Sequence, residues 1–236
     1  MQSAAPPPPA AETAYRHVKE GLLAGRLPAG EMLSEGDVAG ELAMSRTPVR
    51  EAFLRLAAEG WLRLFPKRGA LVAPVAPGEA EDVVAARLLL ETHAVEAVVA
   101  RPAARDALVA ELRRLVSRQQ AAVAAGDLEA YGAHDAAFHL AITAAGGNAV
   151  LAAFAVTLRE RQRRMTALSV GAAGERAPGF VAEHEALVAA VAAGDAARFR
   201  GVLSDHLREA HLPGASREGV RQDAQRQDAQ RPGGDR

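Results

Sequence analysis

The sequence predicts a mainly α-helical protein in two parts, and three observations lead to that prediction. Apolar residues recur at helical spacing through most of the chain, and 49% hydrophobic residues are enough to build buried cores. Alternating apolar residues flank a turn at 61–73, where they predict one β-hairpin. A stretch at 74–78 containing Pro and Gly then separates this part from one without strand signals. We expect a small domain of helices and a hairpin, followed by an all-α six-helix bundle.

Four segments follow from these boundaries. Residues 1–11 are rich in Pro and Ala and are expected to form a disordered tail. Residues 12–75 form the first domain, and residues 79–213 form the second. Residues 214–236 have no apolar face, contain the tandem repeat RQDAQ, and are expected to be disordered.

Helix-breaking residues divide the second domain into six helical segments. Gly194 and Asp195 combine a helix-ending glycine with an N-capping aspartate. The run from Gly171 to Gly179 is expected to interrupt another pair of helices. The expected helices span 79–101, 104–125, 127–146, 148–171, 180–193 and 195–211.

Composition excludes several classes of protein. The chain has no cysteine, which excludes disulfide scaffolds, thiolate metal sites and cysteine nucleophiles. No apolar run approaches the roughly 18 residues of a membrane span, and the N-terminus lacks the pattern of a signal peptide. We therefore expect a soluble, cytoplasmic protein without a membrane partner.

Charge is unevenly distributed along the first domain, although the formal net charge of the chain is only −1. Residues 11–42 contain three basic and six acidic side chains, whereas residues 43–75 contain six basic and two acidic ones. This local excess of basic residues indicates a surface for a phosphate backbone. Aromatic residues make up only 4% of the chain, which argues against base stacking on single strands.

The basic segment has the element order of a winged helix-turn-helix. Ser34 opens one helix with a capping-box pattern, and Ser45 is placed to cap a second helix with Pro48 in its first turn. In such a fold the start of the second helix faces base edges, and the hairpin tip touches the DNA backbone. Spacing alone leaves open the alternative that Arg46 and Arg50 merely decorate a solvated helix.

The residues of this segment resemble the DNA-binding domain of the GntR family of bacterial transcription regulators. The resemblance covers nearly all of 12–75 and is carried by SRTPVREA at 45–52 and LxxEG at 56–60. It implies a homodimer on palindromic double-stranded operator DNA. The DNA contacts that it implies are Ser45, Arg46, Thr47 and Arg50 in the recognition helix and Lys67, Arg68 and Gly69 in the wing. Gly36 departs from the pattern, because many relatives carry an operator-binding Arg there.

Titratable side chains lie on otherwise apolar helix stripes of the second domain. Asp135 and His139 are four residues apart on one face, and His184 and His206 lie on two further helices. Each histidine taken alone is explained by a hydrogen bond within the core. Taken together, the four groups are costly to bury unless a divalent metal satisfies them jointly. Zn²⁺ is the ion that this donor set favours, with Ni²⁺ and Mn²⁺ as alternatives.

The second domain also resembles the FCD effector domain of the FadR-type branch of the GntR family, over about 79–210. The resemblance implies that the same Asp and three His residues are the metal ligands. Arg87 shares a stripe with apolar residues, and two interpretations remain open for it. It either pairs with Glu91 within the helix or anchors the carboxylate of an anionic ligand.

These patterns together predict a ligand-responsive transcription repressor in which a small organic acid completes the coordination of the metal. The alternative is a metal-dependent hydrolase or lyase fused to a DNA-binding domain, because an open metal site can activate water. No general base, GxSxG nucleophile or phosphate-binding loop is evident, so we do not expect an enzyme. In a third interpretation the metal is structural or is itself the signal.

The first long helix of the second domain predicts a homodimer independently of the resemblance. Its apolar residues fall on two sides, and such a helix needs a second partner, for which two-fold pairing is the commonest solution. The two sets are Val83, Leu90, Ala94 and Ala97, and Val84, Leu88, Val95 and Val98.

Overall fold

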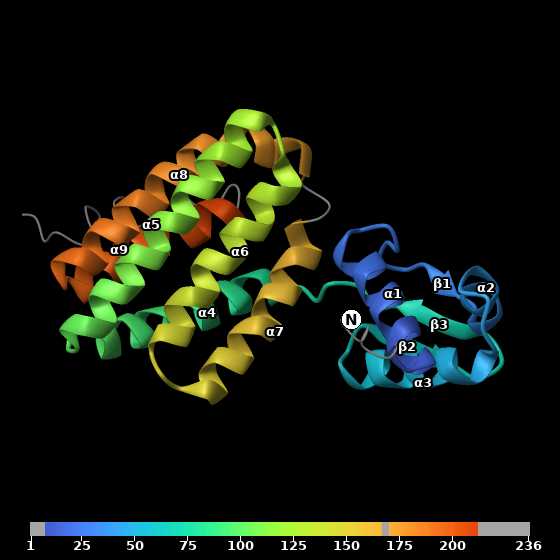
Figure 1. The fold of residues 1–236 in the computed structure, drawn as a ribbon. Helices are drawn as coiled ribbons and strands as arrows, with labels where there is room; N and C mark the ends of the chain where they lie inside the picture. The colour runs from blue at the N-terminus through green and yellow to red at the C-terminus, as the bar shows by residue number, and fades with distance from the viewer. Residues whose placement is uncertain (1–7, 167–169, 212–236) are drawn as a thin grey trace, which may run out of the picture. The chain divides into compact units, whose positions relative to one another are not determined.

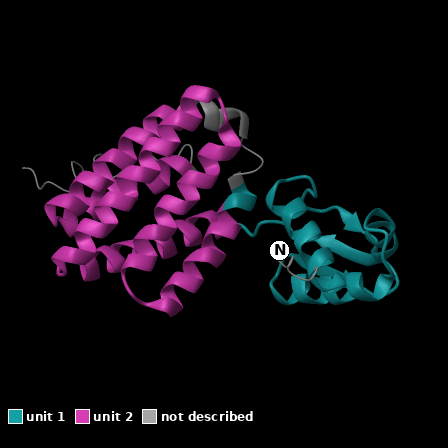
Figure 2. Ribbon diagram, in the orientation of Figure 1, with its two compact units in different colours: residues 1–77, 163–168 teal, residues 78–162, 169–236 magenta. Residues whose placement is uncertain are grey.

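The computed structural model describes residues 8–166 and 170–211, which form two compact units (Figures 1 and 2). The N-terminal unit runs to Pro77 and includes residues 163–166, and the C-terminal unit contains the other described residues from Gly78 on. The RQDAQ repeat and the rest of the expected C-terminal tail lie outside the described residues.

The N-terminal unit consists, in the described residues, of three helices and a small antiparallel sheet. Its elements are α1 (Ala10–Leu23), β1 (Met32–Leu33), α2 (Glu35–Glu41), α3 (Arg46–Ala58), β2 (Leu62–Phe65) and β3 (Gly69–Val72). The predicted hairpin is confirmed, with Arg63 opposite Leu71. Strand β1 was not predicted; it pairs with the other edge of β3 and gives the order β1-β3-β2. Two residues are too few for an alternating pattern to indicate a strand.

The caps of the helices explain where the elements of this unit begin. Helix α1 begins at Ala10, inside the segment expected to be a tail, with Pro9 at its N-cap. The Ser34 hydroxyl accepts from the backbone N–H groups of Gly36 and Asp37, which confirms the predicted cap of α2. Ser45 occupies the N-cap of α3 but makes no capping hydrogen bond. The third helical residue is proline, which lacks the N–H that a capping side chain would bind.

The C-terminal unit is all-helical in its described residues and has six helices there, as many as expected. They are α4 (Glu79–Val99), α5 (Pro102–Ala125), α6 (Leu128–Ala145), α7 (Ala149–Thr166), α8 (Val170–Ala193) and α9 (Ala196–His211). Gly194 has the left-handed φ of +71°, and Asp195 accepts from the backbone N–H of Arg198, as the helix-end signals predicted. No helix in the described ranges is both long enough and apolar enough to cross a membrane.

Helix α8 corrects the expected interruption at 171–179. It begins at Val170 and continues through Pro178, so the glycines and the proline do not separate two elements. Ala177 and Val181, on either side of the proline, are buried in the core of the unit. Packing against neighbouring helices therefore outweighs the unfavourable helix propensity of Gly and Pro in this segment.

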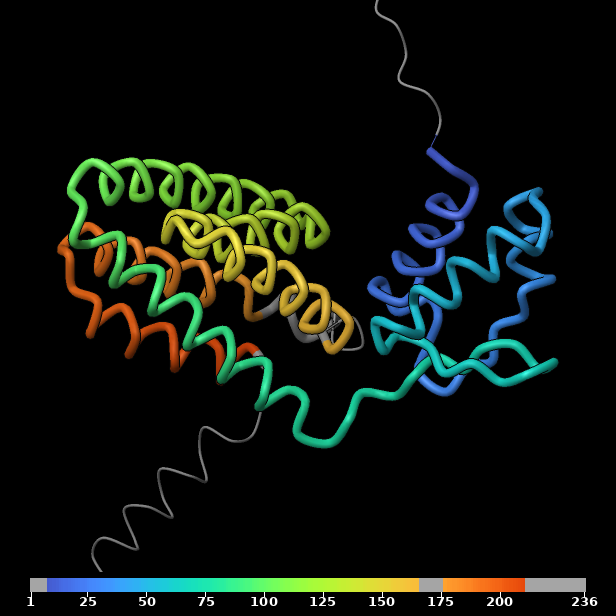
Figure 3. The backbone as a smooth tube through the Cα atoms, turned by 90° about the horizontal axis from the view of Figure 1, so that it is seen from below, coloured from blue at the N-terminus to red at the C-terminus, as the bar shows by residue number. Residues whose placement is uncertain are grey.

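Five of the helices form a ring around the core. Helix α4 packs against α6 and α9, α5 packs against α6 and α8, and α8 packs against α9. Figures 1 and 3 show these helices side by side, with α7 crossing one side. The middle of the ring is filled by buried side chains that include Phe138, Ile142 and Leu203. This arrangement brings inward-facing residues of α6, α8 and α9 close together.

The two apolar sides of α4 are covered largely by the chain itself, which corrects the residue sets offered for a dimer. Val83, Val84, Ala94, Val95 and Val98 are all buried within the unit, because α4 lies between two helices of the ring. Large apolar side chains are instead exposed at other positions of α4 and on α7. These are Leu89 at 71% exposure, Val150 at 64%, Phe154 at 60% and Val156 at 48%.

Candidate functional site

The four predicted metal ligands converge inside the helical ring. Asp135 and His139 come from α6, His184 from α8 and His206 from α9. One potential ligand atom of each residue lies within 4.8 Å of all the others. The three histidines are at most 3% exposed, and the Asp135 side chain is 18% exposed. Three helices that are separate in sequence therefore build one cluster of three nitrogen donors and one oxygen donor.

The spacing of these donor atoms suits a single divalent ion. Nε2 of His184 lies 3.3 Å from Nε2 of His206 and 3.5 Å from Oδ1 of Asp135, and Nε2 of His139 lies 3.7 Å from the same oxygen. Ligands about 2.0–2.2 Å from a zinc ion and at ordinary angles are roughly 3–3.6 Å apart. Nε2 of His139 is also buried without a hydrogen-bond partner in the described residues. A metal ion would satisfy this atom.

Hydrogen bonds orient all three imidazoles from behind. Each ring makes a contact through Nδ1 with a carboxylate or amide oxygen, which leaves Nε2 facing the cluster. The contacts are His139 with Glu91 at 2.7 Å, His184 with Gln119 at 2.7 Å and His206 with Glu183 at 2.6 Å. Sequence reasoning did not find Gln119 or Glu183. A polar residue on the otherwise apolar buried face of α5 was the signal for Gln119.

The electrostatic surroundings favour the protonation states that bind metals. Burial, reinforced by His206, lowers the pKa of His184 to about 3. Burial, reinforced by Arg87, holds the pKa of His139 well below its ordinary value. Burial alone would raise the pKa of Asp135, but Arg159 and the neighbouring histidines hold it well below its ordinary value. Neutral imidazoles and an ionised carboxylate are the forms that ligate a divalent ion.

Two arginines lie beside the cluster. Arg87 is 2% exposed and donates to Glu91 at 3.0 Å, so the intrahelical pair that the sequence left open does form. It also donates to the Gln162 side-chain oxygen at 2.5 Å. Arg159, which sequence reasoning missed, donates to Asp135 at 2.6 Å and to the same Gln162 oxygen at 2.9 Å. Nε of Arg159 is buried and has no hydrogen-bond partner in the described residues.

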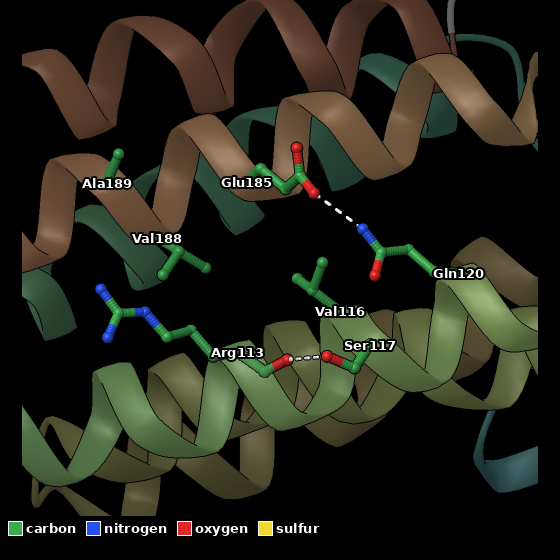
Figure 4. A pocket seen from close by; sticks show the side chains of 7 residues that line it. All are labelled: Arg113, Val116, Ser117, Gln120, Glu185, Val188 and Ala189. Carbon is green, nitrogen blue, oxygen red and sulfur yellow. Dashed lines mark hydrogen bonds between the residues drawn. The ribbon is translucent and has the colours of Figure 1, made fainter.

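Side-chain hydrogen bonds connect α5 and α8 both inside the unit and at its surface. Gln119 reaches His184 inside the unit, and the next residues along each helix, Gln120 and Glu185, are hydrogen-bonded at 2.7 Å on the outside. Figure 4 shows this outer pair at the edge of a groove that is also lined by Val116 and Val188. The double contact fixes the register of α5 against α8 and with it the position of the His184 ring.

The residues expected to bind DNA lie in two places in the N-terminal unit. Ser45, Arg46, Thr47 and Arg50 are exposed in the first turns of α3 or at its cap, and Lys67 and Arg68 are exposed in the turn of the hairpin. Both groups border one cleft, whose lining includes Arg46 and Arg50 of α3 and the hairpin residues Lys67 to Gly69. The helix start and the hairpin turn are therefore close enough to act on one ligand.

The backbone at position 69 requires glycine for structural reasons, apart from any contact with DNA. Its φ is +101°, and a Cβ atom at this position would lie 2.2 Å from the carbonyl oxygen of Leu33. Only glycine allows β1 to approach the hairpin this closely. Lys67 also has a positive φ, of +62°, which turns the chain at the tip.

Two side chains of the recognition surface are positioned by neighbours on α2. Arg50 is 67% exposed and forms a bidentate ion pair with Glu35. A Cβ atom at Gly36 would lie 3.2 Å from Nη2 of Arg46, so the absence of a side chain at position 36 makes room for the Arg46 guanidinium.

The two parts of the chain match two known families. Residues 10–72 match the bacterial regulatory proteins of the gntR family, and residues 82–209 match the FCD domain. An uncharacterized HTH-type transcriptional regulator in an unstable DNA locus of Streptomyces ambofaciens is 34% identical, over 82% of this chain and 80% of that protein. A probable D-xylose utilization operon transcriptional repressor of Paenarthrobacter nicotinovorans is 30% identical, over 80% and 81%.

Solved structures share the fold. The structure of Escherichia coli McbR/YncC superimposes with a TM-score of 0.69 at 25% identity, covering 96% of this chain and all of that one. A transcriptional regulator structure from Rhodococcus sp. RHA1 superimposes with a TM-score of 0.72 at 20% identity, covering 86% and 95%.

Proposed function

The chain belongs to the gntR family of bacterial regulatory proteins, and we propose that it is a repressor whose operator binding is controlled through its FCD domain by a divalent metal and a small organic acid. It is a DNA-binding transcriptional regulator and not an enzyme, and some of its relatives are repressors. To this the proposal adds that the FCD domain holds a metal, that a small organic acid is the effector, and that the acid weakens operator binding.

The observation that carries the proposal is the cluster of four converging donors. Three buried histidines, each oriented by a hydrogen bond at Nδ1, face one carboxylate. Such a set leaves coordination positions open on an ion that accepts five or six ligands. We propose Zn²⁺ as the resident ion, with Ni²⁺ and Mn²⁺ as alternatives, held by Asp135, His139, His184 and His206.

The charge next to the cluster supports an anionic effector. Arg159 pairs with Asp135 of the cluster, Arg87 pairs with Glu91, which holds His139 of the cluster, and both arginines are largely buried. A carboxylate entering beside the metal would find guanidinium donors in the fork geometry that suits it. We propose that Arg87, together with Arg159, selects an acid over a neutral ligand.

The experiment compares operator affinity for three forms of the protein. A duplex is first selected by the full chain from a randomised library, and its affinity is measured for chelated protein, Zn²⁺-loaded protein, and Zn²⁺-loaded protein with short mono- and dicarboxylates. We expect the loaded form to bind and a carboxylate, but not its matched amide, to weaken binding. Equal affinity in all forms would contradict control through this site, and a response to metal alone would make the metal itself the signal.

Substitutions in the two DNA-contacting groups should have different effects. Arg50→Ala should weaken binding to the selected duplex by about 1–3 kcal/mol more than binding to random DNA, because a recognition-helix Arg reads a base edge. Lys67→Ala in the wing should weaken both alike and flatten the salt dependence by about one unit of slope, since it meets phosphate. Fluorescence anisotropy titrations at several salt concentrations measure both. An equal loss of both affinities in Arg50→Ala would contradict base reading.

We propose that the active species is a homodimer on palindromic operator DNA. Its support in this chain is the set of exposed large apolar side chains of α4 and α7 in the C-terminal unit. Large apolar side chains that are exposed to water on two helices of one unit favour a surface that a partner covers, and a second copy offers a matching one.

A further inference from the structure

We propose that Glu35 is a positioning residue for DNA recognition: it holds the Arg50 guanidinium so that one edge only is presented to a base. The inference rests on the proposed function, in which Arg50 reads the operator. It assigns a role to Glu35, which makes no base contact itself but determines how strongly Arg50 discriminates between DNA sequences.

The geometry of the pair divides the guanidinium into two edges. Nε of Arg50 donates to Oε1 of Glu35 at 3.0 Å, and Nη2 donates to Oε2 at 2.9 Å. No hydrogen bond from Nη1 occurs in the part of the chain that the structure describes. The edge formed by Nη1 and the second hydrogen of Nη2 therefore keeps two parallel donors. These two donors match O6 and N7 of guanine in the major groove.

The fold holds Glu35 in this place independently of DNA. Glu35 is the first residue of α2, directly after the Ser34 cap, and its side chain is 25% exposed against 67% for Arg50. The ion pair spans the two helices of the helix-turn-helix. The hydrogen bond from Arg50 lowers the pKa of Glu35, so the carboxylate stays ionised at neutral pH. The Arg50 side chain is thus oriented before it meets DNA.

This orientation affects sequence selectivity more than overall affinity. An arginine without a partner samples many rotamers and pairs with any phosphate, which favours binding to every sequence. An oriented arginine loses less conformational entropy when it meets the matching base. The carboxylate also adds a negative charge next to the DNA surface, which weakens binding wherever the base contact is missing. Glu35 should therefore raise the ratio of specific to non-specific affinity.

The test compares Glu35→Gln with a matched control, Asp37→Asn. Asp37 lies in the same first turn of α2, is exposed, and makes no ion pair within the described residues, so its substitution removes the same charge without freeing Arg50. Affinities of the full chain are measured for the selected duplex and for a random duplex of equal length. We expect Glu35→Gln to lower the affinity ratio about tenfold and to steepen the non-specific salt slope by about one. Asp37→Asn should change both affinities by the same factor.

Further outcomes separate the inference from the function on which it rests. If Arg50→Ala leaves the ratio unchanged, base reading by Arg50 is wrong and the inference falls with it. If Arg50→Ala lowers the ratio but Glu35→Gln does not, the inference alone is overturned. It is also overturned if Glu35→Gln lowers the melting temperature and weakens both duplexes equally, as a purely structural residue would. In the Arg50→Ala background, Glu35→Gln should lower the ratio no further.

Discussion

Chelation of the proposed metal is expected to lower the melting temperature of the C-terminal unit by about 10 °C or more. A ligand that binds only the folded state, at a thousand times its Kd, adds about 4 kcal/mol to stability, and each kcal/mol shifts the midpoint of a domain of this size by several degrees. Without the ion, three imidazoles and a carboxylate remain crowded in the core, and Nε2 of His139 keeps no partner there.

The two units can be followed separately in the same sample. Trp61 is the only tryptophan of the chain and is buried in the core of the N-terminal unit, so its fluorescence reports that unit. Circular dichroism at 222 nm reports mainly the long helices of the C-terminal unit. Chelation should lower the midpoint seen by circular dichroism and leave the tryptophan transition in place.

Variants assign this effect to the cluster. His184→Ala combined with His206→Ala should abolish the response to chelation, whereas His93→Ala, an exposed histidine of α4, should retain it. A small carboxylate should raise the midpoint only in the metal-loaded protein with an intact cluster. Elemental analysis that finds no metal in gently purified protein, together with a carboxylate effect that survives chelation and the double variant, would contradict the metal site.

The convergence of Asp135, His139, His184 and His206 was predictable because its signal is local. Asp135 and His139 share a helical face by their spacing alone, and His184 and His206 each stand out on an apolar stripe. Of the residues that contact them, Gln119 stands out on the apolar buried face of α5, whereas Arg159 has no such local signal. Arg159 lies in a run of α7 that is rich in basic and polar side chains, where nothing marks one residue as inward-facing. Its contact with Asp135 depends on how α7 crosses α6, which helical periodicity does not specify.

The fold shows the same division between local and tertiary causes. Helix ends marked by a glycine and an Asp cap, as at Gly194 and Asp195, appear where they were predicted. The run from Gly171 to Gly179 has the same kind of breaking residues, yet it is helical. Packing of this part of α8 into the core outweighs the low helix propensity of its glycines and proline. Strand β1 exists only because β3 offers an edge to it, and Gly69 permits the approach.

Phe154→Glu is expected to convert the proposed dimer into a monomer. Phe154 is 60% exposed on α7, and Val150 is 64% exposed one turn earlier, so a charge at this position would be desolvated if a second chain covers the face. Because the side chain lies at the surface of the unit, the substitution should leave the fold intact, and a circular dichroism melt checks this. Light scattering at micromolar concentration measures the mass, which should halve.

Loss of the dimer should then weaken operator binding strongly, because the two half-sites would be bound independently. Linking two DNA-binding domains commonly raises affinity by roughly 10² to 10⁴ without any new contact, so we expect a loss of roughly a hundredfold or more on the palindromic duplex. Affinity for a single half-site should stay unchanged, which distinguishes this effect from damage to the recognition helix.

Ala110→Glu, which adds the same charge to an exposed position of α5, is the matched control and should remain dimeric with full affinity. A wild-type chain that is monomeric at micromolar concentration would contradict the dimer. A Phe154→Glu variant that stays dimeric would place the dimer interface on another face.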